Sequence, residues 1–246
     1  MEKEHEGCER MKRFSASAAP MLMQCAASGD LETAIPGWVA PEVDHDAGAK
    51  GKGTQIHKVF EDAMAFTARD AQCIGQAMTY VAELRQTRRF KIITEATTTA
   101  EFLQQKPHST VDLVLYTKDE LHIVDYKTGK IPVYPQFNKQ LMYYAACFSD
   151  LAPNALGVNL HIVQPWADVM ESWFCSTIEL MEFIVEAQIT EQNILAKRLA
   201  FQPGDHCTFC PANPAGFGDK AAPYCPAMLS MLYPLEVDED EILGMV

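Results

Sequence analysis

Two short apolar segments in the middle of the chain constrain its fold most. Residues 110–116 (TVDLVLY) and 121–126 (LHIVDY) are rich in aliphatic side chains and are separated by a polar turn around Lys118 and Asp119. This pattern predicts two antiparallel strands that form a hairpin. Because both segments are so apolar, we expect the two strands to lie centrally in a sheet.

The flanking sequence predicts a mixed α/β core. Further strand patterns occur at 90–97, 157–164 and 169–175, and helical spacing occurs at 54–84, 138–149 and 177–200. A capping box at Ser176 and Glu179 is expected to open the last helix, and Pro203-Gly204 to close it. The order helix, three strands, helix, two strands, helix differs from the regular alternation of a doubly wound sheet.

The length and the ends of the chain predict one main domain. With 246 residues, the chain can bury one sizeable core. We expect a polar arm at 1–14, a single domain at 15–232 that includes a Cys-rich segment at 204–228, and an acidic tail at 233–246.

The composition narrows the function and the location. The chain carries 20 basic and 33 acidic residues, a net charge of -13. This balance argues against a general nucleic-acid coat protein, but it allows an enzyme that meets DNA through one local groove. No apolar run approaches the roughly 20 residues that span a bilayer, and the charged start lacks a secretory signal. We therefore expect a cytoplasmic protein without membrane contact.

Three charged residues stand out within the apolar hairpin. Asp112 lies on the first predicted strand, Asp125 lies near the end of the second, and Lys127 follows two residues later on the same face. Two carboxylates can hold a hard divalent cation, which activates water for hydrolysis, while an ammonium group offsets charge on a phosphate. A solvated ion pair is the alternative, but charges are costly in so apolar a setting. The pattern therefore favours a hydrolytic site.

An ordered set of residues resembles the RecB-like branch of the PD-(D/E)XK nucleases. That family has a His on an upstream helix, then a Glu and an Asp on strands, then D-x-K, then Q-x-x-x-Y on a helix. This chain supplies, in that order, His57, Glu95, Asp112, Asp125-Tyr126-Lys127, and Gln140 with Tyr144. The stretch VDYKTGKIPVYPQFNKQLMYYA is also similar to a group of phage-encoded nucleases in that family. The resemblance spans residues 15–230.

The resemblance implies a fold, an activity and a metal site. The fold would be a restriction-endonuclease-like core with a central mixed sheet flanked by helices. The activity would be Mg²⁺- or Mn²⁺-dependent exonuclease cleavage of DNA with a free end, in phage recombination or DNA processing, with a recombination protein as an expected partner. His57, Asp112, Asp125 and the backbone carbonyl of Tyr126 would bind the metal, and Lys127 would be the catalytic lysine.

The same resemblance implies that Gln140 and Tyr144, one helical turn apart, contact DNA or brace the site. Two positions depart from the family pattern. Ser109 stands where the family often has Gly, and Val111 stands where it has Pro. Neither departure removes a metal ligand.

Three assignments have competing explanations. His57 can also be a core or surface residue that pairs with Glu61 one turn further on. Glu101 can take the part of Glu95, or both can be surface charges. The rival function is a catalytically inactive nuclease-fold module that binds DNA or serves in assembly.

Four of the eight cysteines have the placing of metal ligands. Cys207 and Cys210 form C-x-x-C, Cys225 follows, and Cys25 lies far upstream. This arrangement resembles the iron–sulfur staple of RecB-like helicase-nucleases and CRISPR-adaptation nucleases, which implies a [4Fe-4S] cluster. Zinc, with His206 as a ligand, is the alternative, and Cys25 alone can be a buried free thiol. The remaining cysteines are expected to be core or surface thiols: Cys8, Cys73, Cys147 and Cys175.

Basic and aromatic residues give weaker signals. The densest basic run, with a second pair before His57, predicts either phosphate contacts beside the site or a solvated helix end. The three tryptophans can stack on bases, but core packing is the preferred interpretation. These residues are Arg85, Arg88, Arg89 and Lys91; Lys50 and Lys52; and Trp38, Trp166 and Trp173.

Overall fold

The computed structural model describes residues 14–39, 68–213 and 225–228. The chain divides into two compact units. The sheet unit comprises residues 13–20 and 43–191, and the terminal unit comprises residues 1–12, 21–42 and 192–246. The predictions for residues 1–13 of the polar arm, the acidic tail, His57, Cys8, and Lys50 with Lys52 fall outside the described residues. Phe14, the last residue of the predicted arm, is described and is only 1% exposed.

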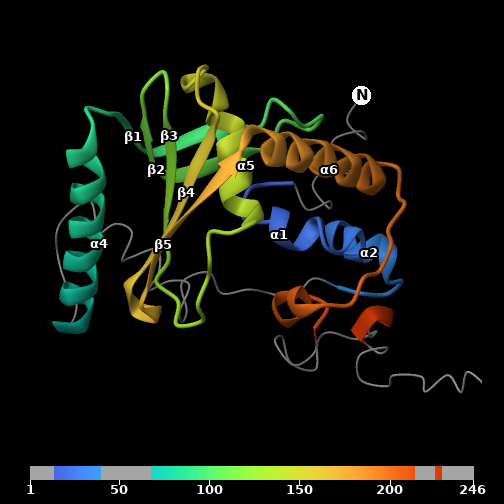
Figure 1. Cartoon of the computed structure of the whole chain (residues 1–246). Coiled ribbons are helices and arrows are strands. Elements are labelled where there is room, and N and C mark those ends of the chain that lie inside the picture. Colours follow the sequence, from blue (N-terminus) through green and yellow to red (C-terminus); the bar gives the residue numbers. More distant parts are fainter. Residues whose placement is uncertain (1–13, 40–67, 214–224, 229–246) are drawn as a thin grey trace, which may run out of the picture. The chain divides into compact units, whose positions relative to one another are not determined.

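The sheet unit is built on one five-stranded mixed sheet (Figure 1). Its strands lie in chain order and pair antiparallel, except that β3 and β4 are parallel and are connected through a helix. The β2–β3 turn is closed by a 2.8 Å hydrogen bond from the Thr117 N–H to the Glu120 carbonyl. The predicted hairpin and mixed sheet are therefore confirmed. The strands are β1 (Lys91–Thr99), β2 (His108–Tyr116), β3 (Leu121–Tyr126), β4 (Gly157–Gln164) and β5 (Val169–Ser176).

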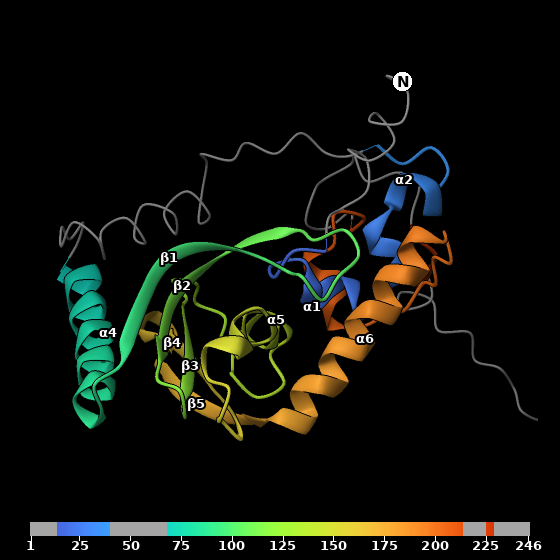
Figure 2. The ribbon, with the colours of Figure 1, turned by 90° about the horizontal axis from the view of Figure 1, so that it is seen from above.

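Helices cover both faces of this sheet. The sheet curves around α5 (Lys139–Phe148), and α4 (Ala68–Thr87) lies on its outer side (Figure 2). On the α4 side, Ala77 of α4 packs with Leu113 and Leu115 of β2, and Tyr80 of α4 contacts His161. The opposite helix begins at Asn138, whose side chain caps it by accepting hydrogen bonds from two backbone N–H groups.

One residue interrupts the regular geometry of β1. Glu95 has a positive φ of 45°, although Thr94 and Ala96 on either side pair with Leu113 and Val111. The register therefore places the distortion opposite Asp112. A non-glycine residue in the left-handed region costs about 1–3 kcal/mol, and such strain concentrates at functional sites.

Helix α6 (Thr177–Leu195) begins where the sequence predicts and ends earlier. The capping box is confirmed: the Ser176 N–H and Oγ–H donate to Glu179 Oε2, both at 2.7 Å, and the Glu179 N–H donates back to Ser176 Oγ at 3.3 Å. The predicted end near Ala200 is wrong. The helix stops at Leu195, before Pro203 is reached.

The early end of α6 has a local cause within the terminal unit. Lys197 adopts the left-handed conformation with φ 57°, and the Lys197 and Arg198 N–H groups donate to the carbonyls of Ile194 and Asn193. This is a Schellman cap with lysine in the place usually taken by glycine. The Lys197 ammonium bonds the buried carboxylate of Asp30, which favours this position. Burial alone would raise the pKa of Asp30, but hydrogen bonds from Lys197 and Thr33 hold it below its ordinary value.

The terminal unit brings the two ends of the described chain into one core. Its short helices are η1 (Ala26–Gly29), α2 (Leu31–Ala34) and η4 (Asp205–Phe209), and α1 (Ala19–Leu22) begins in the sheet unit. Leu31, Ile35 and Trp38 pack with Cys210 and Cys225 in this core. The expected core role of Trp38 is therefore confirmed. Among the described helices, none has the length and apolar character to cross a membrane.

Candidate active site

The two predicted carboxylates lie where β2 and β3 stop pairing. The last pair of this ladder is Leu113 with Val124, and Asp112 and Asp125 are the next residues on each strand. Asp112 Oδ2 accepts a 2.7 Å hydrogen bond from the Tyr126 N–H, which fixes the first carboxylate against the second strand. Asp125 is buried, with only 3% of its surface exposed. The fold therefore brings both acids to one opening between neighbouring strands.

Lys127 and Gln140 complete this group. The Lys127 ammonium lies 2.8 Å from Asp125 Oδ2 and donates a 2.8 Å hydrogen bond to Gln140 Oε1. Gln140 Nε2 donates to the other oxygen of Asp125 at 3.2 Å. The first turn of α5 thus holds both the lysine and the carboxylate through one amide side chain.

Tyr144 braces the same group from the next turn of α5. Its hydroxyl donates a 2.6 Å hydrogen bond to the Thr110 carbonyl and lies 3.5 Å from Gln140 Nε2. Burial raises the pKa of this phenol above its ordinary value, so the hydroxyl stays protonated at neutral pH. Of the two roles expected for Gln140 and Tyr144, these contacts favour bracing.

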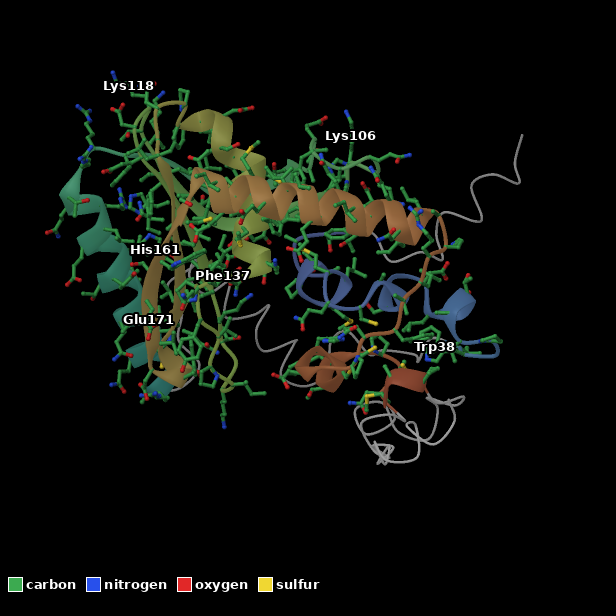
Figure 3. The ribbon with its side chains drawn as sticks, turned by 45° about the vertical axis from the view of Figure 1, so that its right-hand side comes forward. Trp38, Lys106, Lys118, Phe137, His161 and Glu171 are labelled. Carbon is green, nitrogen blue, oxygen red and sulfur yellow. The ribbon has the colours of Figure 1, made fainter. Side chains whose placement is uncertain are left out.

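The site concentrates negative charge. Burial and the neighbouring charge of Asp125 raise the pKa of Asp112 to about 8, against the opposing effect of the hydrogen bond from the Tyr126 N–H. The charge of Glu95 raises the pKa of Asp112 further and also contributes to the raised pKa of the Tyr126 hydroxyl. Glu101, the alternative to Glu95, instead pairs with Lys106 at 2.5 Å on the surface (Lys106 is labelled in Figure 3). The structure therefore favours Glu95 as the acid near the site.

The donor set suits a hard divalent cation. Asp125 Oδ2 is buried, and its partner in the described part of the chain is the Lys127 ammonium at 2.8 Å. Carboxylate and backbone carbonyl oxygens are the ligands that Mg²⁺ and Mn²⁺ prefer. Within residues 14–39, 68–213 and 225–228, no three His, Cys, Asp or Glu side chains form a ready metal-binding group. The predicted third side chain, His57, lies outside those ranges.

The predicted basic run is placed elsewhere. Arg88 pairs with Glu120 at 3.2 Å, and the Lys91 ammonium lies 5.8 Å from the centre of the Tyr116 ring. Both contacts are at the turn end of the β2–β3 hairpin, whereas Asp125 and Lys127 are at its open end. These contacts favour the interpretation of this run as a solvated helix end.

A buried glutamine beside the site is not among the residues predicted from the sequence. Gln164, at the end of β4, is 0% exposed, and its amide holds the chain just after Lys127. It accepts from the Val133 N–H at 2.8 Å and donates to the carbonyls of Gly129 and Ile131 at 2.8 and 2.9 Å. The signal in the sequence is weak: a polar residue follows the apolar pair Ile162-Val163 and precedes Pro165.

The four predicted cysteine ligands all lie in the terminal unit and are all buried. Burial raises the pKa of the Cys210 thiol to about 11, and the charges of Cys225, Cys25 and Cys207 act in the same direction. Burial also raises the pKa of Cys207, with Cys25 and Cys225 again contributing. The four thiols are therefore near enough to influence one another, although almost the whole chain separates Cys25 from the others. Among the described residues, however, no three His, Cys, Asp or Glu side chains form a ready metal-binding group, and this holds for the cysteines too.

The remaining predicted residues have separate places. His206, the alternative zinc ligand, lies 3.7 Å from Cys207 Sγ through Nε2 and contacts Gln24 through Nδ1. Cys73 and Cys175 are buried in the sheet unit, and Cys147 is half-buried there.

Comparison with known proteins identifies the family. The model of the family described as "Protein of unknown function (DUF2800)" matches residues 71–222, which is more than half of the chain. The chain therefore belongs to this family. A solved structure described as "Crystal structure of SSO0001" is similar at 13% sequence identity and a TM-score of 0.38, over 84% of this chain and 88% of that one.

Proposed function

We propose that this chain is a divalent-metal-dependent deoxyribonuclease with a PD-(D/E)XK core of the RecB-like branch. It removes nucleotides from an end of DNA, in phage recombination or DNA processing. One observation carries the proposal. Two carboxylates, a lysine and a glutamine meet at the opening between β2 and β3, around the buried carboxylate of Asp125, whose Oδ2 is paired with the Lys127 ammonium at 2.8 Å.

The proposed metal is held by Asp112, Asp125 and the Tyr126 carbonyl, with His57 as the expected further ligand. When bound, such a cation polarises a phosphate oxygen and lowers the pKa of coordinated water. The reaction adds water across one phosphodiester bond and leaves a phosphate monoester and a free hydroxyl group.

The other residues orient the reacting groups. The Lys127 ammonium is fixed between Asp125 and Gln140, so it can orient water and offset charge on the phosphate in the transition state. Gln140 and Tyr144 keep the lysine and Asp125 in register through α5. Preorganised donors of this kind act without reorganisation during the reaction.

The test is cleavage of end-labelled linear DNA and of closed circular DNA by pure protein. Mg²⁺ or Mn²⁺ should support release of labelled product from the linear substrate, and EDTA should stop it. Asp125→Asn should abolish the activity, whereas Asp150→Asn, the same change at an exposed position, should preserve it. Undiminished cleavage by Asp125→Asn would remove the proposal. A folded wild-type protein that binds DNA without cutting it would favour the inactive nuclease-fold module.

We also propose that Cys25, Cys207, Cys210 and Cys225 hold a [4Fe-4S] cluster, with zinc as the alternative. The four buried thiols offer the soft donors that both metals take. Their role is structural, because hydrolysis needs no electron transfer. Protein purified without oxygen should be brown and should contain iron and sulfide. Zinc without iron would mean that the four cysteines bind zinc in place of the cluster. Protein that contains neither metal would overturn the assignment of these cysteines as metal ligands.

A further inference from the structure

A short loop after Lys127 is held in a fixed shape. We call Gly129–Phe137 the aromatic loop. Gln164 makes three hydrogen bonds to its backbone, at Val133, Gly129 and Ile131, which use both amide protons and the carbonyl oxygen of this buried side chain. At its far end, the Asn138 N–H donates to the Pro135 carbonyl at 3.2 Å. The loop therefore presents its side chains without first having to be ordered.

This rigid loop presents large apolar side chains to solvent. Ile131, Tyr134 and Phe137 are 64%, 55% and 54% exposed. Phe137 (labelled in Figure 3) also has a positive φ of 52°, a conformation that is strained for a residue with a large side chain. Its ring lies 4.7 Å from that of half-buried Trp173 on β5, at an angle of 51°. A strained backbone at Phe137 and a loop fixed by hydrogen bonds together hold aromatic rings in solvent, which indicates a binding surface.

The charge around the aromatic loop departs from that of the chain. The sequence has no Asp or Glu between Asp125 and Asp150, although acidic residues outnumber basic ones by 33 to 20 overall. The same stretch carries Lys127, Lys130 and Lys139. Lys127 and Lys139 have carboxylate partners, and Lys130 is exposed on the loop itself. On β5, Glu171 is exposed two residues from Trp173, so Lys130 is the cation that the aromatic loop itself offers to an anionic ligand.

We propose that the aromatic loop, together with Trp173, binds the bases of an unpaired DNA strand that leads to the Asp112–Asp125–Lys127 group. The inference rests on the proposed function and adds a strand preference to it. Exposed rings beside the exposed Lys130 match the way proteins bind single strands, where aromatic side chains stack on bases and cations contact the backbone. A duplex hides the faces of its bases, so it gains nothing from Phe137 and Tyr134.

The test measures binding without cleavage. Fluorescence anisotropy in EDTA compares a labelled single-stranded oligonucleotide with a labelled blunt hairpin duplex. Phe137→Leu and Tyr134→Leu should each weaken single-strand binding at least about fivefold and change duplex binding little, because each removes one stacking contact. Phe137→Trp should keep wild-type affinity, which also shows that this position tolerates replacement. Phe174→Leu is the matched control, since Phe174 is 51% exposed on β5 and points away from Trp173's face.

Three results would overturn the inference. They are an equal loss of single-strand and duplex binding, unchanged single-strand binding in both leucine variants, and a wild-type protein that does not bind the single strand. The last result would indicate a protein partner for this surface. Cleavage is scored separately with Mg²⁺. If Asp125→Asn abolishes cleavage while the leucine variants bind normally, the nuclease proposal stands and the single-strand role of the aromatic loop is refuted. If wild-type protein does not cleave DNA but Phe137→Leu still weakens single-strand binding, the nuclease proposal is refuted and the single-strand role of the loop stands.

Discussion

The carboxylate–lysine group of the sheet unit and the cysteine group of the terminal unit are assembled in opposite ways. The first draws on a short span, from Glu95 to Tyr144, and directional hydrogen bonds fix its side chains. The second draws on both ends of the described chain and consists of four buried thiols, of which Cys210 and Cys225 belong to an apolar core. The carboxylate–lysine group is thus ordered by hydrogen bonds among its own side chains, whereas the cysteine group depends on the surrounding apolar core or on a bound metal.

This difference predicts opposite responses to mutation. Charges crowded in a buried site store unfavourable energy, so removing one should affect the reaction more than the stability of the fold. Thiols that share a metal contribute its binding energy to folding, so removing one should affect stability first. The predictions below test this separation, beginning with the largest effect.

Asp112→Asn should lower cleavage about a thousandfold or more and leave the melting temperature unchanged or higher. The asparagine can still accept the hydrogen bond from the Tyr126 N–H, and the repulsion with Asp125 is gone. Cleavage rates and thermal melting of the same preparation check both parts. A melting temperature several degrees below that of wild type would mean that this carboxylate supports the fold.

Lys127→Ala should lower kcat about a hundredfold with little change in DNA affinity, because the ammonium acts in the transition state. Lys118→Ala is the control, since it removes an exposed lysine in the β2–β3 turn, at the other end of the hairpin. Steady-state cleavage gives kcat, and anisotropy in EDTA gives affinity. An equal loss of both in Lys127→Ala would make this lysine a phosphate anchor.

Cys207→Ala should lower the free energy of unfolding by at least about 3 kcal/mol if the thiol holds a structural metal. In a chain of this size the melting temperature then falls by roughly 6–12 °C. Cleavage per folded molecule should stay close to wild type at temperatures below the transition. Cys147 is a half-buried cysteine in α5, and Cys147→Ala should lower the free energy of unfolding less than Cys207→Ala does. Equal losses in the two variants would reduce the cysteine group to ordinary core packing.

Mild acid should weaken the sheet unit through a buried histidine pair. His161 Nδ1 lies 2.9 Å from the Tyr80 hydroxyl, and its Nε2 lies 2.9 Å from His122 Nδ1 (His161 is labelled in Figure 3). Burial, with a contribution from His122, lowers the pKa of His161 from 6.5 to about 3. Burial also lowers the pKa of His122, which Glu120 opposes and Arg88 assists. Both imidazoles are therefore neutral in the folded chain at neutral pH.

The direction of the acid effect follows from these pKa values. Between pH 6.5 and about 3 the unfolded chain binds a proton that folded His161 does not, so the stabilisation is complete above pH 6.5 and is lost as the pH falls. One such proton changes the free energy of unfolding by about 1.4 kcal/mol per pH unit, or roughly 3–6 °C in melting temperature. Melting curves at pH 7 and 5.5 should show a shallower loss for His161→Gln than for wild type. His108→Gln, at an exposed position, should follow wild type.

The sequence predicts most of the sheet unit because its signals are local. The strand at 157–164 matches β4, and the Ser176–Glu179 box marks the start of α6, since alternation and capping depend on near neighbours. The predicted end of α6 was wrong because the observed end depends on an ion pair between Lys197 and Asp30, a residue distant in sequence. For the same reason Gln164 was missed: its partners, at Gly129 to Val133, are visible only in the fold.

The terminal unit also has a consequence for the order of folding during synthesis. Residues 21–42 leave the ribosome long before residues 192–246 are made, and the delay is roughly 10–30 s at ordinary elongation rates. During that interval Leu31, Ile35 and Trp38 lack the C-terminal half of their core. A nascent chain therefore exposes apolar surface at its beginning until its end is complete. A chain that stops before Cys207 keeps every residue of the sheet unit and leaves this early segment permanently without its partners.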